Sequence, residues 1–140
     1  MKGLGTALIT PFTEEGKVDF PALSQLIEHQ VAGGTDYLVI LGTTSEVPTL
    51  THQEQNAIID YVVKQVAGRM PLVLGIGGNS TAAVVERISE LKEQLIAHFT
   101  AILSVTPYYN RPQQEGLYQH FCAVAEASPL PVILYNVPKR

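Results

Sequence analysis

The sequence is short of cysteine, of charged residues and of long apolar runs, and each shortage excludes something. Cys122 is the only cysteine in 140 residues, so the chain can form no internal disulfide, which fits a reducing compartment such as the cytoplasm. Charged residues make up 16% of the chain, and its net charge of −4 comes without a basic cluster. We therefore expect neither nucleic acid nor an anionic membrane surface as a partner.

The first apolar stretch is too short for a membrane span or a signal peptide, because Thr10 and Pro11 interrupt it. No low-complexity segment or linker divides the chain, and its hydrophobic fraction of 46% is ordinary for a globular protein. These features predict a single domain over residues 1–140, without a membrane segment.

Short apolar runs alternate along the chain with longer segments of helical period. The runs, rich in Val, Ile and Leu, are Thr6–Phe12, Tyr37–Leu41, Leu72–Ile76, Ala101–Thr106 and Val132–Tyr135. Such composition is typical of parallel strands buried on both faces. Helices are predicted from Asp19 to Gly33, behind the capping-box pattern Thr51-x-x-Glu54, behind Asn79 or Ser80 and including Leu91 and Leu95, and over residues 113–127. The βαβαβαβαβ order predicts an α/β fold, either a barrel or a doubly wound sheet.

Hydroxyl, amide and glycine residues gather where the predicted strands end. The strings are Thr10-Pro11, Gly42-Thr43-Thr44-Ser45-Glu46, Gly75-Ile76-Gly77-Gly78-Asn79, Thr106-Pro107-Tyr108-Tyr109-Asn110 and Tyr135-Asn136-Val137-Pro138. The carboxyl ends of parallel strands form the active sites of α/β enzymes, so this distribution favours an enzyme over a scaffold. The glycines of residues 75–78 lack the G-x-G-x-x-G spacing of a dinucleotide site and are interpreted as positions of close backbone approach.

The strings GTTSE, VTPYYNRP and YNVP resemble those of the dihydrodipicolinate synthase family of pyruvate-dependent class I aldolases, in the family's order and spacing. The resemblance runs along nearly the whole chain and implies a (β/α)₈ TIM barrel, of which the chain covers about the first half. It implies a lyase of lysine biosynthesis that condenses pyruvate with aspartate-β-semialdehyde, without metal or organic cofactor. A lysine on the sixth strand would form a Schiff base with pyruvate.

The resemblance also implies roles for hydroxyl groups. Tyr135 would be the acid/base, and Thr43 would link it to Tyr109, which would reach into a neighbouring subunit of a homodimer or homotetramer. A phenol has a pKa near 10, so it needs a hydrogen-bonded partner to exchange protons near neutrality, and a threonine hydroxyl can donate and accept at once. Taken alone, Tyr135 could be a core tyrosine and Tyr109 an interface aromatic.

Carboxylate-binding roles fall to two further positions. Thr44, with Thr43, would hold the pyruvate carboxylate at the start of a helix, and Arg140 would hold the carboxylate of the second substrate. Sialic-acid lyases and keto-sugar-acid aldolases, the alternative within the enzymes, usually depart from this arginine.

Other positions match or depart from the family. Tyr108, Asn79 and His52 match its lysine-feedback pocket, but Gln55 and Ala83 stand where a histidine and a glutamate would be expected, which argues against feedback by lysine. Ser45 replaces a glycine and would be strained if its φ were positive. The histidines have no convincing metal-ligand spacing, and Cys122 is interpreted as a small core residue.

A barrel of this type needs about 250 residues, and none of the lysines (Lys2, Lys17, Lys64, Lys92 and Lys139) has the family's Schiff-base setting. We therefore expect a fragment of a longer protein whose catalytic lysine lies elsewhere. The remaining alternative is a non-catalytic half-barrel that self-associates or binds a complementary fragment.

Overall fold

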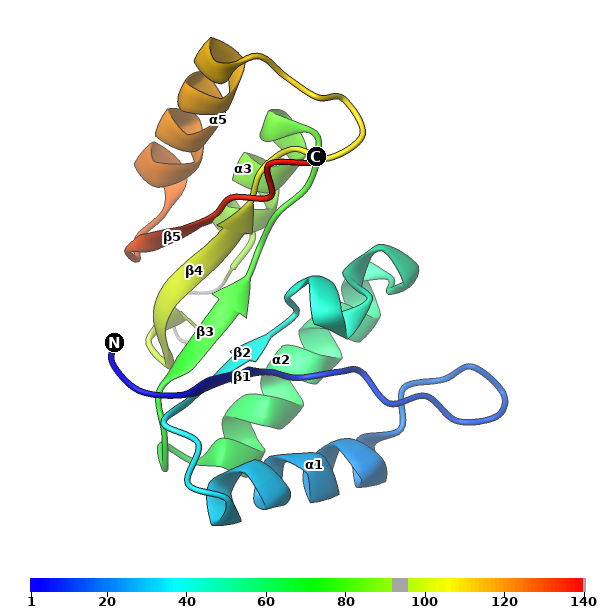
Figure 1. Cartoon of the computed structure of the whole chain (residues 1–140). Helices are drawn as coiled ribbons and strands as arrows, with labels where there is room; N and C mark the ends of the chain where they lie inside the picture. The colour runs from blue at the N-terminus through cyan, green and yellow to red at the C-terminus, as the bar shows by residue number, and fades with distance from the viewer. Residues whose placement is uncertain (92–95, 140) are drawn as a thin grey trace. The chain divides into compact units, whose positions relative to one another are not determined.

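The computed structural model describes residues 1–91 and 96–139, which form two compact units, Met1–Val73 and Leu74–Arg140. Strands and helices alternate along the chain (Figure 1): β1 (Gly5–Ala7), α1 (Phe20–Ala32), β2 (Tyr37–Ile40), α2 (His52–Val66), β3 (Leu72–Gly75), α3 (Thr81–Ser89), β4 (Phe99–Val105), α5 (Gln114–Ala127) and β5 (Val132–Tyr135). Two 3-10 helices, η1 (Thr43–Ser45) and η2 (Val47–Thr49), lie between β2 and α2. This alternation is the one predicted from the sequence.

In the first unit, β1 and β2 are parallel, with Gly5 opposite Tyr37 and Ala7 opposite Val39. The Leu38 N–H donates to Pro71 O at 3.1 Å, which places the approach to β3 beside β2. Helices α1 and α2 pack against each other, and their apolar faces form the core of this unit. Its fully buried side chains include Leu23, Ile27, Leu38, Ile40, Ile59, Val62 and Val66.

Both helices of the first unit begin at the predicted caps. Asp19 Oδ1 accepts the Ala22 N–H at 2.9 Å. Thr51 Oγ1 accepts the Glu54 N–H at 3.2 Å, and Glu54 Oε2 accepts the Thr51 N–H at 2.8 Å, which completes the capping box. Each cap satisfies N–H groups that the helix itself leaves without acceptors.

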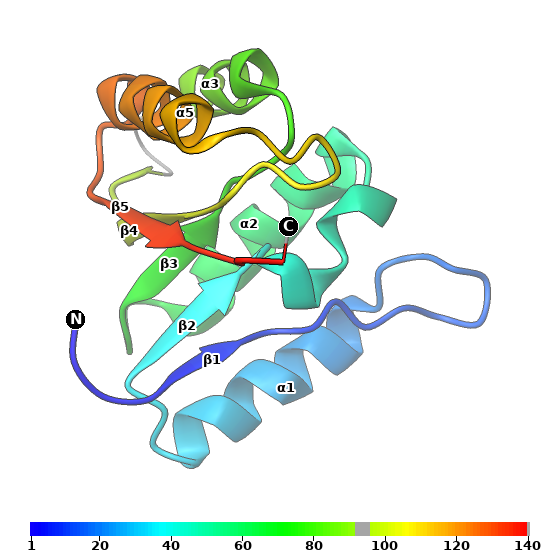
Figure 2. The ribbon, with the colours of Figure 1, turned by 45° about the horizontal axis from the view of Figure 1, so that its top comes forward.

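In the second unit, β4 and β5 are parallel, with Ile102 opposite Val132 and Val105 opposite Tyr135. The Ile76 N–H donates to Leu103 O at 3.0 Å, so the chain leaving β3 runs beside β4. Helices α3 and α5 lie side by side (Figure 2), and α5 also contacts β5. Ser80 is the residue that caps α3, accepting the Ala83 N–H at 3.4 Å.

Several predicted bounds were wrong. Strand β1 ends at Ala7 instead of Phe12, since Pro11 has no N–H for a ladder, and Phe12 instead forms an antiparallel bridge with Val18. Strand β4 begins at Phe99, two residues before the prediction. Helix α3 ends at Ser89, before Leu91, and the predicted helical residue Leu95 lies outside the described residues.

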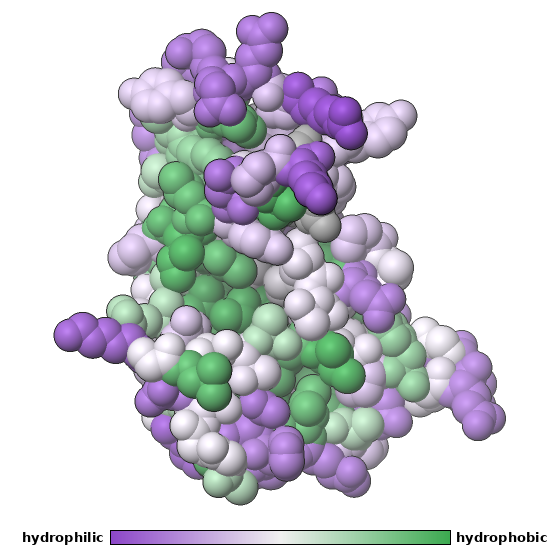
Figure 3. Space-filling model, in the orientation of Figure 1, coloured by the Kyte–Doolittle hydropathy of each residue, from purple (hydrophilic) through white to green (hydrophobic). Residues whose placement is uncertain are grey.

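The prediction that every strand is buried on both faces fails for β1, which has no buried residue and whose Ala7 is exposed, and most clearly for β5. Ile133 is 37% exposed, Leu134 56% and Tyr135 39%. Figure 3 shows apolar side chains gathered on the surface where β5 and β4 lie. A continuous apolar run therefore identifies the strand, but it does not report how much of that strand this chain covers.

Candidate functional site

The predicted site residues lie in both units. Thr43, Thr44 and His52 belong to the first unit. Asn79, Tyr108, Tyr109 and Tyr135 belong to the second, and Arg140 lies outside the described residues.

Thr43 and Thr44 are exposed at the carboxyl end of β2, in the 3-10 turn η1. They are the first two residues of this short helix, at a helix start as expected, whereas the α-helix that follows begins at His52. The turn closes through the Ser45 N–H to Gly42 O at 3.0 Å and the Glu46 N–H to Thr43 O at 3.2 Å. Since the first N–H groups of such a turn have no acceptor within it, those of Thr43 and Thr44 remain available to an anion.

Ser45 fixes this turn to the end of β1. Its hydroxyl donates to Leu8 O at 2.6 Å, and the Thr10 hydroxyl donates to Ser45 O at 2.8 Å. Ser45 is 2% exposed and Thr10 5%, so both bonds are shielded from water. The two hydroxyls join the strand-end strings of β1 and β2, as expected when neighbouring parallel strands end at one edge.

Ser45 does not have a positive φ, so the condition under which this serine would be strained is not met. The residues with positive φ in this segment are Leu41 at 53° and Glu46 at 55°. Ser45 is the last residue of the right-handed turn, where a side chain is tolerated. The strained positions therefore flank the Thr43–Ser45 turn instead of occupying it.

Tyr109 stands in the loop that follows β4 and is 91% exposed. Its φ of 71° is in the left-handed region, which is unusual for a bulky side chain. Tyr108, the preceding residue, is half-buried. The two neighbouring tyrosines therefore differ in exposure, with Tyr108 half-buried and Tyr109 almost entirely open to solvent.

Tyr135 is the last residue of β5 and pairs with Val105. Its carbonyl accepts the Thr106 N–H at 3.1 Å, which fixes the end of β5 to the start of the Tyr109 loop. Within the described residues of the second unit, neither the Tyr109 nor the Tyr135 hydroxyl makes a hydrogen bond. The predicted link through Thr43 stays a prediction, because Thr43 belongs to the first unit.

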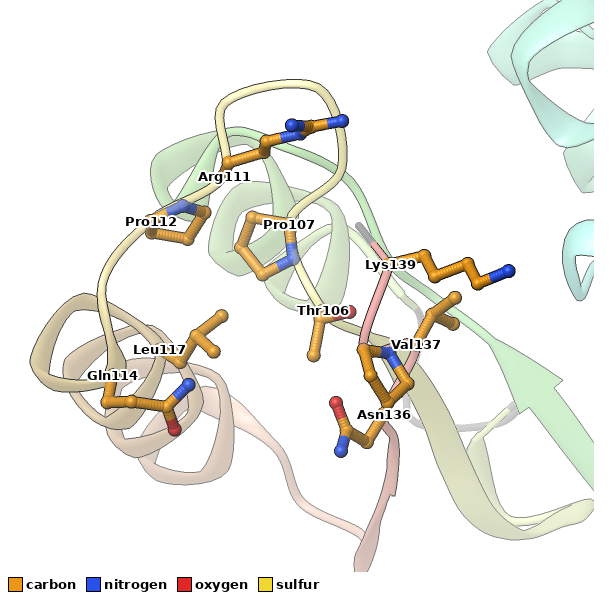
Figure 4. A pocket seen from close by; sticks show the side chains of 10 residues that line it. Thr106, Pro107, Arg111, Pro112, Gln114, Leu117, Asn136, Val137 and Lys139 are labelled. Carbon is orange, nitrogen blue, oxygen red and sulfur yellow. The ribbon is translucent and has the colours of Figure 1, made fainter.

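A cavity of about 480 Å³ opens beyond the ends of β4 and β5 (Figure 4). Arg111 and Lys139 supply positive charge, and their charged ends point away from Leu117 at the opposite side. Thr106, whose buried Oγ1 has no hydrogen-bond partner, also lines it. The remaining lining residues are Pro107, Pro112, Gln114, Asn136, Val137 and Pro138.

The cavity was not predicted as a site, although Thr106 and Asn136 follow directly on the ends of β4 and β5. The sequence shows that these residues follow strands, but it does not show the turn that brings Arg111 into the lining of the same cavity. Arg111 has a φ of 48°, which its residue type does not signal. The cavity thus extends the polar edge already identified at Tyr135.

The predicted feedback residues are divided between the units. His52 is exposed at the start of α2, whereas Asn79 and Tyr108 belong to the second unit. Ala83 lies on α3, as an exposed residue, and Gln55 is buried on α2, where its amide donates to Leu50 O at 3.1 Å.

His120 is a packed histidine of the kind expected. It is 3% exposed on α5, and its Nδ1 lies 2.8 Å from Thr81 Oγ1 of α3. Burial lowers the pKa of this imidazole.

Over residues 1–91 and 96–139, no group of three or more His, Cys, Asp and Glu side chains is placed to hold a metal ion.

Cys122, expected in the core, is half-buried on α5, and a hydrogen bond with it raises the pKa of the exposed Tyr118.

None of the helices described is long and apolar enough to cross a membrane.

Sequence and structure comparisons agree with this geometry. The sequence profile of the dihydrodipicolinate synthetase family matches residues 1–140. A 4-hydroxy-tetrahydrodipicolinate synthase of Parabacteroides distasonis is 57% identical over 140 residues, which are 100% of this chain and 46% of that protein. The crystal structure of dihydrodipicolinate synthase from Aquifex aeolicus is 44% identical, with a TM-score of 0.89 over 100% of this chain and 46% of its own.

A solved structure described as a monomeric dihydrodipicolinate synthase variant is 37% identical, with a TM-score of 0.88 over 99% of this chain and 45% of its own. The chain thus spans about half the length of the relatives it matches. These matches confirm the predicted fold class, the first half of a (β/α)₈ barrel. The chain belongs to the dihydrodipicolinate synthetase family.

Proposed function

We propose that the full-length protein containing this chain condenses pyruvate with aspartate-β-semialdehyde in lysine biosynthesis, as a 4-hydroxy-tetrahydrodipicolinate synthase of the cytoplasm. The observation that carries the proposal is the set of strand-end strings, GTTSE, VTPYYNRP and YNVP, in a chain whose relative at 57% identity bears that name. Hydroxyl groups and carboxylate-binding groups are the residue types that an aldol reaction between two acids requires.

The reaction would begin with a lysine outside this chain. Its amine attacks the carbonyl carbon of pyruvate, water leaves, and the resulting imine makes the methyl group acidic. Loss of a methyl proton gives an enamine whose carbon attacks the aldehyde. Because the imine itself accepts the electrons, the scheme uses no metal or organic cofactor, and dialysis against EDTA should leave the turnover rate unchanged.

Tyr135 would exchange protons with the carbinolamine and imine, assisted by Thr43 and Tyr109. The support for these roles is their place at strand ends and the 91% exposure of Tyr109, which suits a side chain that completes the site of a second subunit. On this proposal the active protein is a homodimer or homotetramer. A dilution series that follows activity and molar mass together tests this, since an active monomer would contradict it.

The carboxylates of the two substrates would be recognised by different residues. The free N–H groups and hydroxyls of Thr43 and Thr44 would hold pyruvate, and Arg140 would hold the second substrate through paired hydrogen bonds. Replacing Arg140 with alanine should raise KM for aspartate-β-semialdehyde by about tenfold or more and leave KM for pyruvate nearly unchanged.

The acceptor aldehyde decides between this proposal and a sialic-acid or keto-sugar-acid aldolase. The test measures kcat/KM of the full-length protein at saturating pyruvate with aspartate-β-semialdehyde, N-acetylmannosamine and glyceraldehyde. We expect aspartate-β-semialdehyde to be preferred by at least about a hundredfold. Preference for either sugar aldehyde would overturn the assignment.

A further inference from the structure

The loop after β4 holds two left-handed residues within three positions. Tyr109 has a φ of 71° and Arg111 a φ of 48°, and neither is a glycine. Such backbone costs free energy and persists only where surrounding contacts hold it. The backbone preferences of tyrosine and arginine do not favour these positive φ angles, so contacts with the rest of the protein must hold the loop in this conformation.

Tyr109 is the central residue of a three-residue turn. The Asn110 N–H donates to Tyr108 O at 2.9 Å, a bond across a single intervening residue. With a positive φ at its centre, this γ-turn is the rarer and more strained of the two forms. Because the Tyr109 side chain is 91% exposed, its own packing does not hold the turn.

The side chain of Asn110 ties this turn to the loop after β3. Asn110 Nδ2 donates to Asn79 O at 2.7 Å, and Asn79 Nδ2 donates to Asn110 Oδ1 at 3.3 Å. Both ends of the Asn110 amide are thus occupied by one partner. We call this pair of hydrogen bonds the Asn79–Asn110 clip.

The Asn79 end of the clip is firmly placed. Asn79 comes directly before Ser80, which caps α3, a helix that packs against α5. Two residues earlier, Gly77 lies so close to β4 that an added Cβ would stand 2.8 Å from Val105 Cγ1 and 3.0 Å from Val105 N. The clip therefore connects a strained turn to a rigid segment.

We propose that Asn110 is a positioning residue that holds Tyr109 in the orientation needed for proton transfer. This inference rests on the proposed function, in which the Tyr109 hydroxyl belongs to the proton relay. Because the Tyr109 side chain is 91% exposed on its own chain, the direction in which it leaves that chain is set by the backbone turn, and the turn is restrained by the clip.

Two substitutions at Asn110 disrupt the clip, and a third at a nearby position serves as the control. The backbone at Asn110 does not have a positive φ, so Asn110→Ala removes both clip bonds without adding strain. Asn110→Asp keeps an acceptor for Asn79 Nδ2 but replaces the donor to Asn79 O with an oxygen that repels it. Gln113→Ala is the matched control, because Gln113 is exposed in the same loop and makes no side-chain cap bond.

The experiment uses the full-length protein and two readouts. Hydrogen exchange of residues 106–112 reports the clip without reference to activity, and steady-state kinetics report its effect on turnover. For Asn110→Ala and Asn110→Asp we expect faster exchange and a kcat lowered by about tenfold or more, with KM for pyruvate unchanged. Gln113→Ala should match the wild type in both readouts.

The decisive comparison is made in a Tyr109→Phe background. If Asn110 acts through the Tyr109 hydroxyl, Asn110→Ala should lower kcat no further once that hydroxyl is gone. An equal loss of kcat in both backgrounds would overturn the inference, as would unchanged hydrogen exchange in Asn110→Ala. A different outcome would refute the proposed function and with it the assigned role of the clip. In that outcome, hydrogen exchange is faster in Asn110→Ala than in the wild type, but the wild type itself has no condensation activity.

Discussion

The hydroxyl of Ser45 is a buried donor whose partner is a backbone carbonyl. It reaches Leu8 O at 2.6 Å, and Ser45 is 2% exposed. At such a site, removal of the donor leaves a buried acceptor without a partner, which costs more than the loss of an exposed bond.

We therefore expect Ser45→Ala to lower the free energy of unfolding by about 1–3 kcal/mol. Ser89→Ala is the control, because its exposed hydroxyl also donates to a backbone carbonyl, Glu86 O, at 2.7 Å. The control should change stability by less than about 0.5 kcal/mol. Urea denaturation of the full-length variants measures both, and equal losses would contradict the importance of burial at Ser45.

His120 makes stability depend on pH in a definite direction. Burial lowers the pKa of its imidazole in the folded state, so the unfolded chain takes up the proton at a higher pH than the folded chain. Stability is therefore fully present above the unfolded pKa of about 6.5 and declines as the pH falls toward the folded pKa.

His120→Gln should flatten this decline between about pH 7.5 and 5.5, since glutamine cannot take up the proton but can still meet Thr81. The measurement is the free energy of unfolding at several pH values in that window. His29→Gln, on an exposed part of α1, should keep the wild-type slope. A wild-type slope in His120→Gln would contradict the argument.

At the scale of elements, helix α2 depends on its capping box. Thr51 Oγ1 and Glu54 Oε2 satisfy two N–H groups that the helix leaves free. Thr51→Ala should lower the free energy of unfolding by about 1 kcal/mol. Gln53→Ala, at an exposed position in the same turn, should have little effect. The two are compared by thermal unfolding, and a similar Tm for both would contradict the capping argument.

The hydrogen bonds from Thr51 also lower the pKa of Glu54. A depressed carboxyl pKa in the folded state stabilises the protein above the unfolded pKa, and this stabilisation is lost as the pH falls through the folded pKa. Part of the acid sensitivity below about pH 4.5 should therefore disappear in Glu54→Gln.

The order of the elements could be predicted from the sequence because apolar period and capping residues act locally. Asp19, Thr51 and Ser80 each cap the helix that was expected behind them. Strand ends were less predictable. Thr10 was expected in the first strand, but it lies beyond the end of β1, where its hydroxyl donates to Ser45 O. The left-handed turns at Tyr109 and Arg111 were also unpredictable, since neither residue type signals a positive φ and the Asn79–Asn110 hydrogen bonds beside Tyr109 join residues distant in sequence.

At the scale of the molecule, the exposed apolar residues of β5 have consequences. Ile133 and Leu134 are 37% and 56% exposed, and contiguous apolar surface favours association. We expect the isolated 140-residue chain to elute as an oligomer in size-exclusion chromatography with light scattering. Leu134→Lys should shift it toward monomer, whereas Tyr118→Lys, at a 63% exposed position on α5, should not. A monomeric wild-type chain would contradict this expectation and the half-barrel alternative.

On the proposed function, pyruvate reacts with a lysine that lies outside this chain. Borohydride reduction in the presence of pyruvate, followed by intact mass and peptide mapping, tests it on the full-length protein and on the 140-residue chain. We expect one pyruvyl adduct on the full-length protein, at a lysine other than Lys2, Lys17, Lys64, Lys92 and Lys139, and none on the shorter chain. An active full-length protein without an adduct, or an adduct on Lys139, would contradict it.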